Sequence, residues 1–379
     1  MLIRPNWAVL VAGSSGWQNF RHQSDVCHMY QILKKGGMSD NNIVTMFFDD
    51  IAYNPSNPYQ GNIINYPNGS NVYKGVLKDY TGDNVTPENF LNVLLGNSSG
   101  VNNRKVLKSG PNDNVFIYMT DHGAPGLFYF PNDILYAPDF IDTLKKMHAT
   151  KMFKNMMIYT KSCESGSMFD NLLPNYLSIY AITASTPQQP SYACYMDQKR
   201  GVYLNDCFSI NFLRDDDNFT KGETLNQQYL RVTNETINSN VCQYGDTSLD
   251  NLLVTDFIGK IHQKRSPVRK YKRNAILSSR AKLHSIARKL EKESLKQINE
   301  IDLDHLLKSR HEFNRELDLL IDSHILYKKY NRRTVDFAPD QCHVATPLPI
   351  DCIKKTVKEL FNNHPNEYQL ETLKYLCAY

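Results

Sequence analysis

The chain has 379 residues, of which 41% are hydrophobic and 22% are charged, enough for one substantial domain plus a smaller one. Its net charge of +4 is divided unevenly: residues 1–260 carry 20 Lys/Arg against 24 Asp/Glu, hence −4, and residues 261–379 carry 23 against 15, hence +8. A membrane-spanning helix and a cysteine zinc site are excluded, because no apolar run is long enough and the eight cysteines lack both zinc spacing and a C-x-x-C pair.

The first 200 residues alternate short apolar runs with segments of helical spacing. Apolar residues recur at that spacing from Val26 to Leu33 before a stop at Gly36, and Thr86 followed by Pro87 predicts the start of another helix. These strands and helices indicate an α/β fold with a mainly parallel sheet covered on both faces, in which ligands bind at the carboxyl ends of the strands. The runs that predict strands lie at residues 8–11, 43–48, 115–119, 156–159 and 179–184.

The character of the chain changes after residue 260. Residues 261–275 are basic and contain Pro267, which indicates an exposed linker, whereas residues 276–379 show apolar residues at helical spacing. We therefore predict a main domain over residues 1–260, a linker over 261–275 and a helical domain over 276–379. The positive charge of the last part fits a nucleic-acid arm or a docked domain, and its amphipathic helices favour docking over nucleic-acid binding.

Two predicted strands end in residues that can react. One runs into His122 followed by Gly123, and another runs into Cys163. Neighbouring parallel strands would place both at the same edge, where a histidine can convert a thiol into a nucleophilic thiolate. The N–H groups of Gly123 and Cys163 would then be donors for an oxyanion. Either residue alone has a structural interpretation, as a small apolar cysteine or a satisfied histidine, and spacing alone leaves both interpretations open.

Several ordered blocks resemble the legumain (asparaginyl endopeptidase) family of caspase-like cysteine proteases. The resemblance covers residues 7–259 and includes both reactive strand ends. It implies a caspase-like α/β/α sandwich with a mainly parallel central sheet, followed by a helical C-terminal pro-domain. The blocks are WAVLVAG (7–13), NFRHQ (19–23), FDDIA (48–52), DYTG (79–82), TPENFL (86–91) and SYACY (191–195).

The resemblance also assigns roles to residues. Cys163 would be the nucleophile, His122 the general base and Asn19 the residue that orients the histidine, with oxyanion donors at Gly123 and Cys163. Asp121 and Glu164 match acidic neighbours of the site. The pocket for the residue before the scissile bond maps onto Arg21, His22, Lys161, Ser191 and Asp206.

Two features depart from the family pattern. Lys161 stands where the family has a glutamate of the specificity pocket, which removes an acceptor and adds a cation. The family's terminal subdomain has four cysteines in two bridges, whereas three are present here, at Cys342, Cys352 and Cys377. We expect Cys377 to pair with Cys352 or with Cys342.

The expected function is that of a cysteine endopeptidase zymogen, activated at acid pH, that cuts peptides after Asn, with Asp as a second residue. Autocleavage candidates are Asn274 and Asn299, and the pro-domain would inhibit the enzyme intramolecularly. Two alternatives stay open. One is a peptide ligase or transamidase that forms the same acyl-enzyme, and the other is a non-catalytic paralogue, in which Lys161 in place of the family's glutamate would indicate that activity has been lost. No cofactor or metal is expected, and the partners are protein and peptide substrates.

The sequence also bears on the compartment. Five N-x-S/T sequons favour the secretory route, and hence a glycoprotein that is lysosomal, endosomal or secreted. Residues 7–12 are apolar but too short for a signal-peptide core, so we expect the signal to be missing from this sequence. The sequons begin at Asn68, Asn84, Asn97, Asn218 and Asn234.

Overall fold

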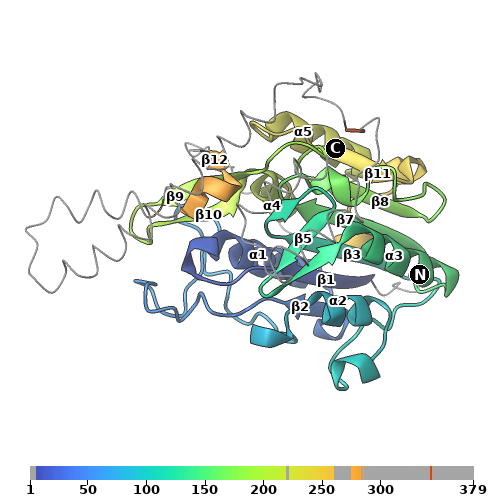
Figure 1. Cartoon of the computed structure of the whole chain (residues 1–379), viewed down its shortest axis with the longest axis horizontal. Coiled ribbons are helices and arrows are strands. Elements are labelled where there is room, and N and C mark those ends of the chain that lie inside the picture. The colour runs from blue at the N-terminus through green and yellow to red at the C-terminus, as the bar shows by residue number, and fades with distance from the viewer. Residues whose placement is uncertain (1–5, 219–221, 260–274, 283–284, 286–341, 344–379) are drawn as a thin grey trace, which may run out of the picture.

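A six-stranded sheet forms the centre of the protein, with the strand order β11-β8-β7-β3-β1-β2 (Figure 1). The computed structural model describes residues 6–218, 222–259, 275–282, 285, 342 and 343. β11 is antiparallel to β8, and the other neighbouring pairs are parallel. The strands are β1 (Asn6–Ala12), β2 (Ile43–Met46), β3 (Asn114–Thr120), β7 (Asn155–Lys161), β8 (Ile179–Thr183) and β11 (Cys242–Gly245).

The five predicted strands and the mainly parallel α/β sheet are thus confirmed, although β2 is two residues shorter than the apolar run at 43–48. β11 was not predicted. Most of the expected helical pro-domain lies outside the described residues, as do Asn274 and Asn299.

Helices cover both faces of the sheet. α1 ends at Gly36 as its sequence predicts, and the Thr86 hydroxyl accepts the N–H of Asn89 at 3.1 Å, which caps the start of α2. Among the described residues, no helix is both long and apolar enough to cross a membrane. The helices are α1 (Phe20–Lys35), α2 (Pro87–Leu94), α3 (Ala137–Ala149), α4 (Cys207–Asn218), α5 (Leu225–Glu235) and α6 (Thr255–Ile258).

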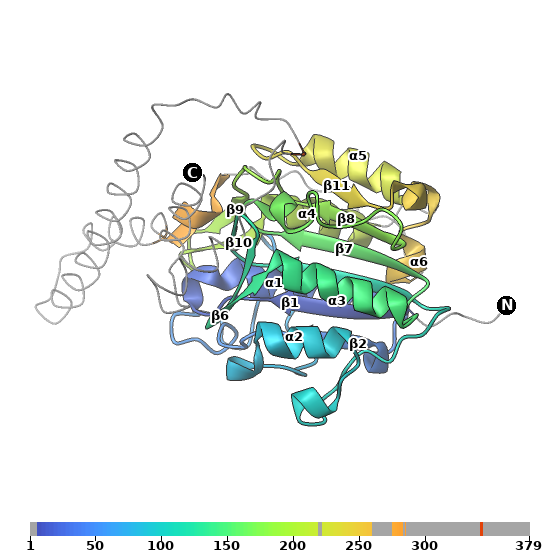
Figure 2. The same ribbon diagram turned by 45° about the vertical axis from the view of Figure 1, so that its right-hand side comes forward.

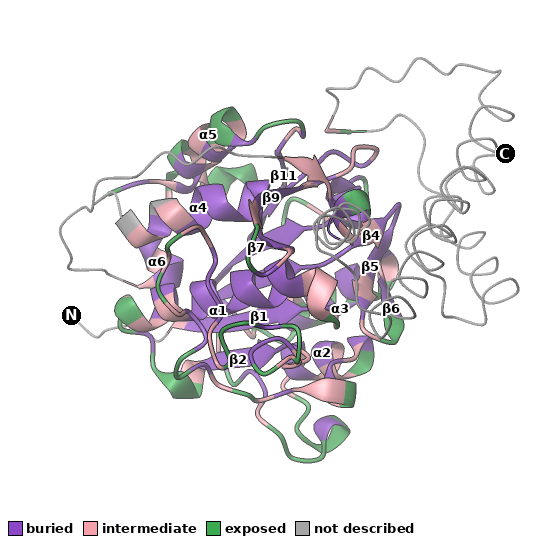
Figure 3. Ribbon diagram, turned by 90° about the vertical axis from the view of Figure 1, so that its left-hand side faces the viewer, coloured by how far each residue is buried: buried purple, intermediate pink, exposed green. Residues whose placement is uncertain are grey.

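Each face of the sheet buries its own apolar core. Along β1, Ala8 and Leu10 belong to the core that α1 and α4 cover, whereas Val9 and Val11 belong to the core beneath α2 and α3. This division follows from the two-residue period of a strand. Figure 2 shows α2 and α3 in front of the sheet, and Figure 3 shows the central strands buried. The result is a three-layer arrangement with the sheet between two layers of helices.

Two small antiparallel sheets flank the main one. The first contains β4 (Gly123–Ala124), β5 (Leu127–Phe130) and β6 (Asp133–Tyr136). In the second, β9 (Tyr192–Asp197) pairs with β10 (Val202–Asp206) on one side and with β12 (Ile276–Leu277) on the other. Residues 276 and 277 are therefore in a strand and not in the predicted helix, because the open edge of β9 supplies backbone partners for them.

Two disulfides connect described residues. Cys194 in β9 is bonded to Cys207 at the start of α4, and Cys242 in β11 is bonded to Cys342. The expected pairing of Cys342 with Cys377 is wrong, because Cys342 lies against β11, where the Tyr244 hydroxyl donates to its carbonyl at 2.6 Å. The other expected partners, Cys352 and Cys377, lie outside the described residues.

Candidate active site

The carboxyl ends of β3 and β7 lie side by side, as the sequence predicts. Thr120 is in register with Lys161, and the N–H of Asp121 continues the ladder by donating to the Lys161 carbonyl at 3.0 Å. A Cβ atom on Gly123 would lie only 2.7 Å from the Cys163 carbonyl oxygen, so this close approach requires glycine. The segment carrying His122 is thereby pressed against the segment carrying Cys163.

Asn19 fixes the orientation of the His122 ring. The Asn19 amide donates to the Ser15 carbonyl at 3.0 Å, which points its oxygen at His122, and His122 Nε2 lies 2.9 Å from that oxygen. Because a carboxamide oxygen only accepts, Nε2 carries the proton and Nδ1 is the basic nitrogen. Asn19 directly precedes α1, so the rigid helix start positions it.

Cys163 sits at a sharp turn that follows β7. Glu164 adopts a left-handed backbone conformation with φ of +47°, an uncommon state for a residue with a side chain. The N–H of Ser191 donates to the Cys163 sulfur at 3.4 Å, a contact that favours the thiolate. Cys27, by contrast, lies on the buried side of α1, where burial raises the pKa of its thiol and keeps it inert.

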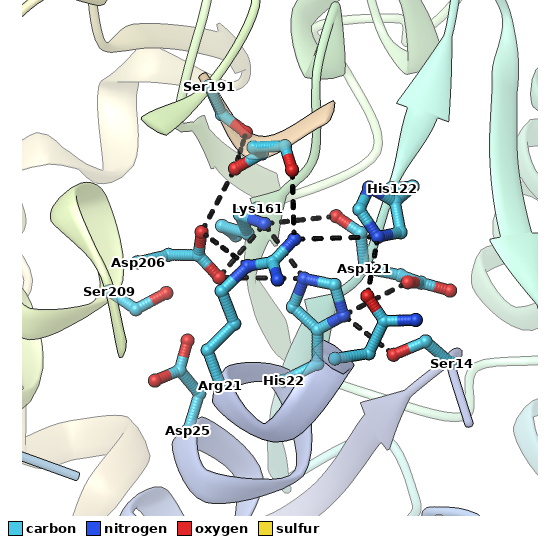
Figure 4. Close-up of polar contacts among 12 residues, drawn as sticks. Ser14, Arg21, His22, Asp25, Asp121, His122, Lys161, Ser191, Asp206 and Ser209 are labelled. Carbon is cyan, nitrogen blue, oxygen red and sulfur yellow. Dashed lines mark hydrogen bonds and ion pairs between the residues drawn. The ribbon is translucent and has the colours of Figure 1, made fainter. Parts of the chain in front are cut away.

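The residues expected to form the specificity pocket converge beside this strand edge (Figure 4). Asp206, at the end of β10, accepts from Arg21 Nε at 3.3 Å with one oxygen and pairs with Lys161 Nζ at 2.9 Å with the other. His22 lies between these groups, with its Nε2 atom 3.1 Å from Lys161 Nζ and its Nδ1 atom 3.1 Å from Asp121 Oδ1. Ser191 completes the set next to Cys163.

Burial shifts the pKa of two groups in this cluster. The pKa of His22 is held well below its usual value by burial, and also by the charges of Arg21 and Lys161, so the ring is neutral. The pKa of Asp25 is raised well above its usual value by burial and by the charge of Asp206. Sequence reasoning missed Asp25; the available signal was its position one helical turn after Arg21.

Residues 276–278 lie against the pocket. β12 adds an antiparallel strand to β9, with Ile276 opposite Ala193 and Leu277 opposite Tyr192. The Ser278 hydroxyl donates to Asp206 Oδ1 at 3.1 Å, and the Ser278 carbonyl accepts from Arg21 Nη2 at 3.3 Å. A short 3₁₀ turn, Ser278–Arg280, follows. Nothing in the sequence pattern singled out Ser278, whose contacts are with residues distant along the chain.

His22, Asp121 and His122 place one potential ligand atom each within 4.8 Å of one another. Their surroundings do not suit a metal ion. Lys161 Nζ already lies 3.1 Å from His22 Nε2, and Arg21 Nη2 lies 3.4 Å from His122 Nε2. Both cations would repel a divalent ion at this distance.

The sequence model of the Peptidase C13 family matches residues 6–260. The chain belongs to the peptidase C13 family. This C13 chain is 51% identical over 268 residues to legumain of Mus musculus, covering 69% of this chain and 61% of that protein. It is 49% identical to legumain of Homo sapiens over the same shares of both chains.

The plant relatives are nearly as similar. The vacuolar-processing enzyme delta-isozyme of Arabidopsis thaliana is 48% identical over 270 residues, covering 67% of this chain and 58% of that protein. The predicted legumain resemblance is thus confirmed, and the C13 chain spans about three fifths of the length of the legumains that it matches. A caspase-1 structure from Spodoptera frugiperda matches 70% of this chain and 92% of its own, at a TM-score of 0.41 and 11% identity, too weakly to bear on function.

Proposed function

We propose that the protein is a cysteine endopeptidase that cuts peptides after asparagine, with aspartate as a second residue, and is made as an inactive precursor. The observation that supports this most directly is the paired strand end. It presses Gly123 against Cys163 and holds His122 with Nδ1 as its basic nitrogen. The Arg21–Asp206 pocket adjoins this pair through Ser191 and Ser278.

The reaction uses the chain's own groups. His122 Nδ1 takes the thiol proton of Cys163, and the thiolate attacks the carbonyl carbon of the scissile bond. The N–H groups of Gly123 and Cys163 donate to the resulting oxyanion. His122 then returns the proton to the leaving amine, and a water molecule hydrolyses the thioester that remains on Cys163.

An asparagine side chain suits the polarity of the pocket. Its carboxamide has an oxygen that accepts and an NH₂ group that donates. Arg21 is a donor, and Asp206 Oδ1, which accepts the Ser278 hydroxyl, is an acceptor on the pocket side. The substrate backbone would add a strand to β9, in the position that β12 occupies here.

The same arrangement supports inhibition by the chain's own C-terminal part. Residues 276–278 take backbone and pocket contacts that a substrate needs, so a substrate cannot bind while they are in place. We expect acid to weaken the hold of the +8 segment on the −4 domain, because carboxylates protonate near a pKa of about 4. Cleavage after Asn274, or alternatively Asn299, would follow.

A lysosomal or endosomal compartment, or secretion, fits this activity. The Arabidopsis thaliana relative is named a vacuolar-processing enzyme. The sequon residues Asn68, Asn97 and Asn234 are exposed, as glycosylation requires.

A peptide-library digest tests the proposed function. The full chain, held at pH 4 and then mixed with the library, should yield fragments ending in Asn, whereas chain kept at pH 7 and a Cys163→Ser chain treated with acid should yield none. Joined peptides instead of fragments would identify a ligase. An acid-treated chain that changes no peptide would indicate a non-catalytic paralogue.

A further inference from the structure

Lys161 carries a charge that water cannot screen. Its side chain is 0% exposed, with Nζ 2.9 Å from Asp206 Oδ2, 3.1 Å from His22 Nε2 and 3.2 Å from the Asp121 carbonyl. A lysine at a strand end often extends its stem to place the ammonium in solvent. Here the ammonium stays under the pocket, so its charge acts on whatever the pocket binds.

The charge of the pocket follows from the groups that face it. Burial and the two neighbouring cations lower the pKa of His22 and so disfavour its charged form, whereas burial and Asp206 raise the pKa of Asp25 and so disfavour its ionised form. Ser278, from the β12 segment, adds no charge. The titratable and charged groups are Arg21, His22 and Asp25 from α1, Asp121 and His122 after β3, Lys161 from β7 and Asp206 from β10.

Among the remaining charges, Asp121 lies against His22 Nδ1, and Lys161, Asp206 and Arg21 form a separate chain of contacts. Lys161 pairs with Asp206 from beneath, at the carboxylate oxygen that faces away from Ser278. Arg21 contacts the other oxygen through Nε and directs Nη2 towards the pocket, where it donates to the Ser278 carbonyl. Since Lys161 offsets the carboxylate, the positive charge of Arg21 is available to a group that enters.

We infer that Lys161 adapts this pocket to peptides with an ionised aspartate before the scissile bond. The inference rests on the proposed peptidase activity and narrows its substrate class. Lys161 acts through Asp206 and not by touching substrate, which makes it a positioning residue for specificity. Without its charge, an aspartate carboxylate would meet Asp206 as a like charge and would enter only when protonated.

The pH dependence of selectivity tests this. The activated enzyme is given two peptides that differ only in having Asn or Asp before the scissile bond. The kcat/KM for the Asp peptide is divided by that for the Asn peptide, and this Asp-to-Asn ratio is measured from pH 4.5 to 6.5. Free aspartate has a pKa of about 3.9, so a pocket that takes only the protonated form loses Asp cleavage about tenfold per pH unit. We expect the wild-type ratio to change by less than about threefold, and the Lys161→Gln ratio to fall about tenfold per unit.

Because both peptides are measured on one preparation, a partly misfolded variant does not alter the ratio. A wild-type ratio that falls tenfold per unit overturns the inference without any variant. If the Asp-to-Asn ratio is independent of pH in both proteins, Lys161 is not the cause of this selectivity, and the inference is wrong. If Asn peptides are cut and Asp peptides are not, only this inference fails; if neither peptide is cut, the proposed function fails and the inference with it.

Discussion

Two side chains contact the Nε2 atom of His122. Asn19 Oδ1 lies 2.9 Å away and Arg21 Nη2 lies 3.4 Å away. The shorter contact sets which ring nitrogen is basic, but Gly123 and the strand ladder would still hold the backbone at His122 beside the backbone at Cys163 without it. Asn19 therefore refines a geometry that the backbone already provides.

We accordingly expect unequal losses from two substitutions. His122→Ala removes the base that acts as a unit with the thiol, so kcat/KM should fall by about a thousandfold or more. Asn19→Ala removes an orienting hydrogen bond worth about 1 kcal/mol, roughly a tenfold effect at most. The measurement is the steady-state kcat/KM of each variant on one Asn peptide, with the concentration of active sites determined by alkylation of Cys163. Equal losses would mean that His122 cannot act as the base unless Asn19 orients its ring.

The reactive residues could be anticipated from the sequence because strand ends and glycine are local signals. His122 and Cys163 each close an apolar run, and strand neighbours follow from chain order. Lys161 was placed in the pocket only by resemblance, and its direction could not be derived. A long side chain turns inward only if buried partners such as Asp206 are there to receive it. The position of Asp206 relative to Lys161 depends on the tertiary structure and cannot be derived from a local sequence pattern.

At the scale of elements, β12 has a large consequence although it is only two residues long, as is β4. Its two residues extend the edge of β9, and the next residue, Ser278, donates its N–H to the Ser191 carbonyl at 2.9 Å. A two-residue strand has no periodicity to recognise. Its position becomes evident only when β9 and β10 are folded beside the main sheet, which explains why the sequence suggested a helix there.

Ser278→Pro should open the cleft of the uncleaved protein. The substitution removes the N–H donor and the hydroxyl that contacts Asp206 and Ser191, at about 1 kcal/mol for each hydrogen bond. Cys163 in the uncleaved chain at pH 7 should then react with iodoacetamide about tenfold faster or more. Arg280→Ala, at an exposed position of the same segment, is the matched control. Equal rates in all three proteins would show that β12 does not restrict access.

At the scale of the molecule, the alternation of strands and helices sufficed to predict a mainly parallel covered sheet. The antiparallel strand β11 was not predicted, because its four residues contain no apolar run. The disulfide partner of Cys342 was not predicted either. Cys242 is 100 residues away in the sequence, and only the folded sheet brings the two cysteines together. Resemblance to the family had directed attention to the terminal cysteines instead.

That disulfide should be visible on a gel. After cleavage near Asn274, the two pieces should migrate together without reductant and separately with it, because Cys242 and Cys342 lie on opposite sides of the cut. Cys342→Ser should separate them in both conditions. Separate migration of the wild-type pieces without reductant would show that the bond is absent from the cleaved protein.

The bond also changes what a single cut can achieve. Cleavage after Asn274 leaves the segment that contains β12 covalently attached to the domain it covers. Rebinding is then intramolecular, at an effective concentration that dilution does not lower. Such an enzyme would remain partly self-competed after processing, and its activity would rise when a reductant or a second cut severs the tether.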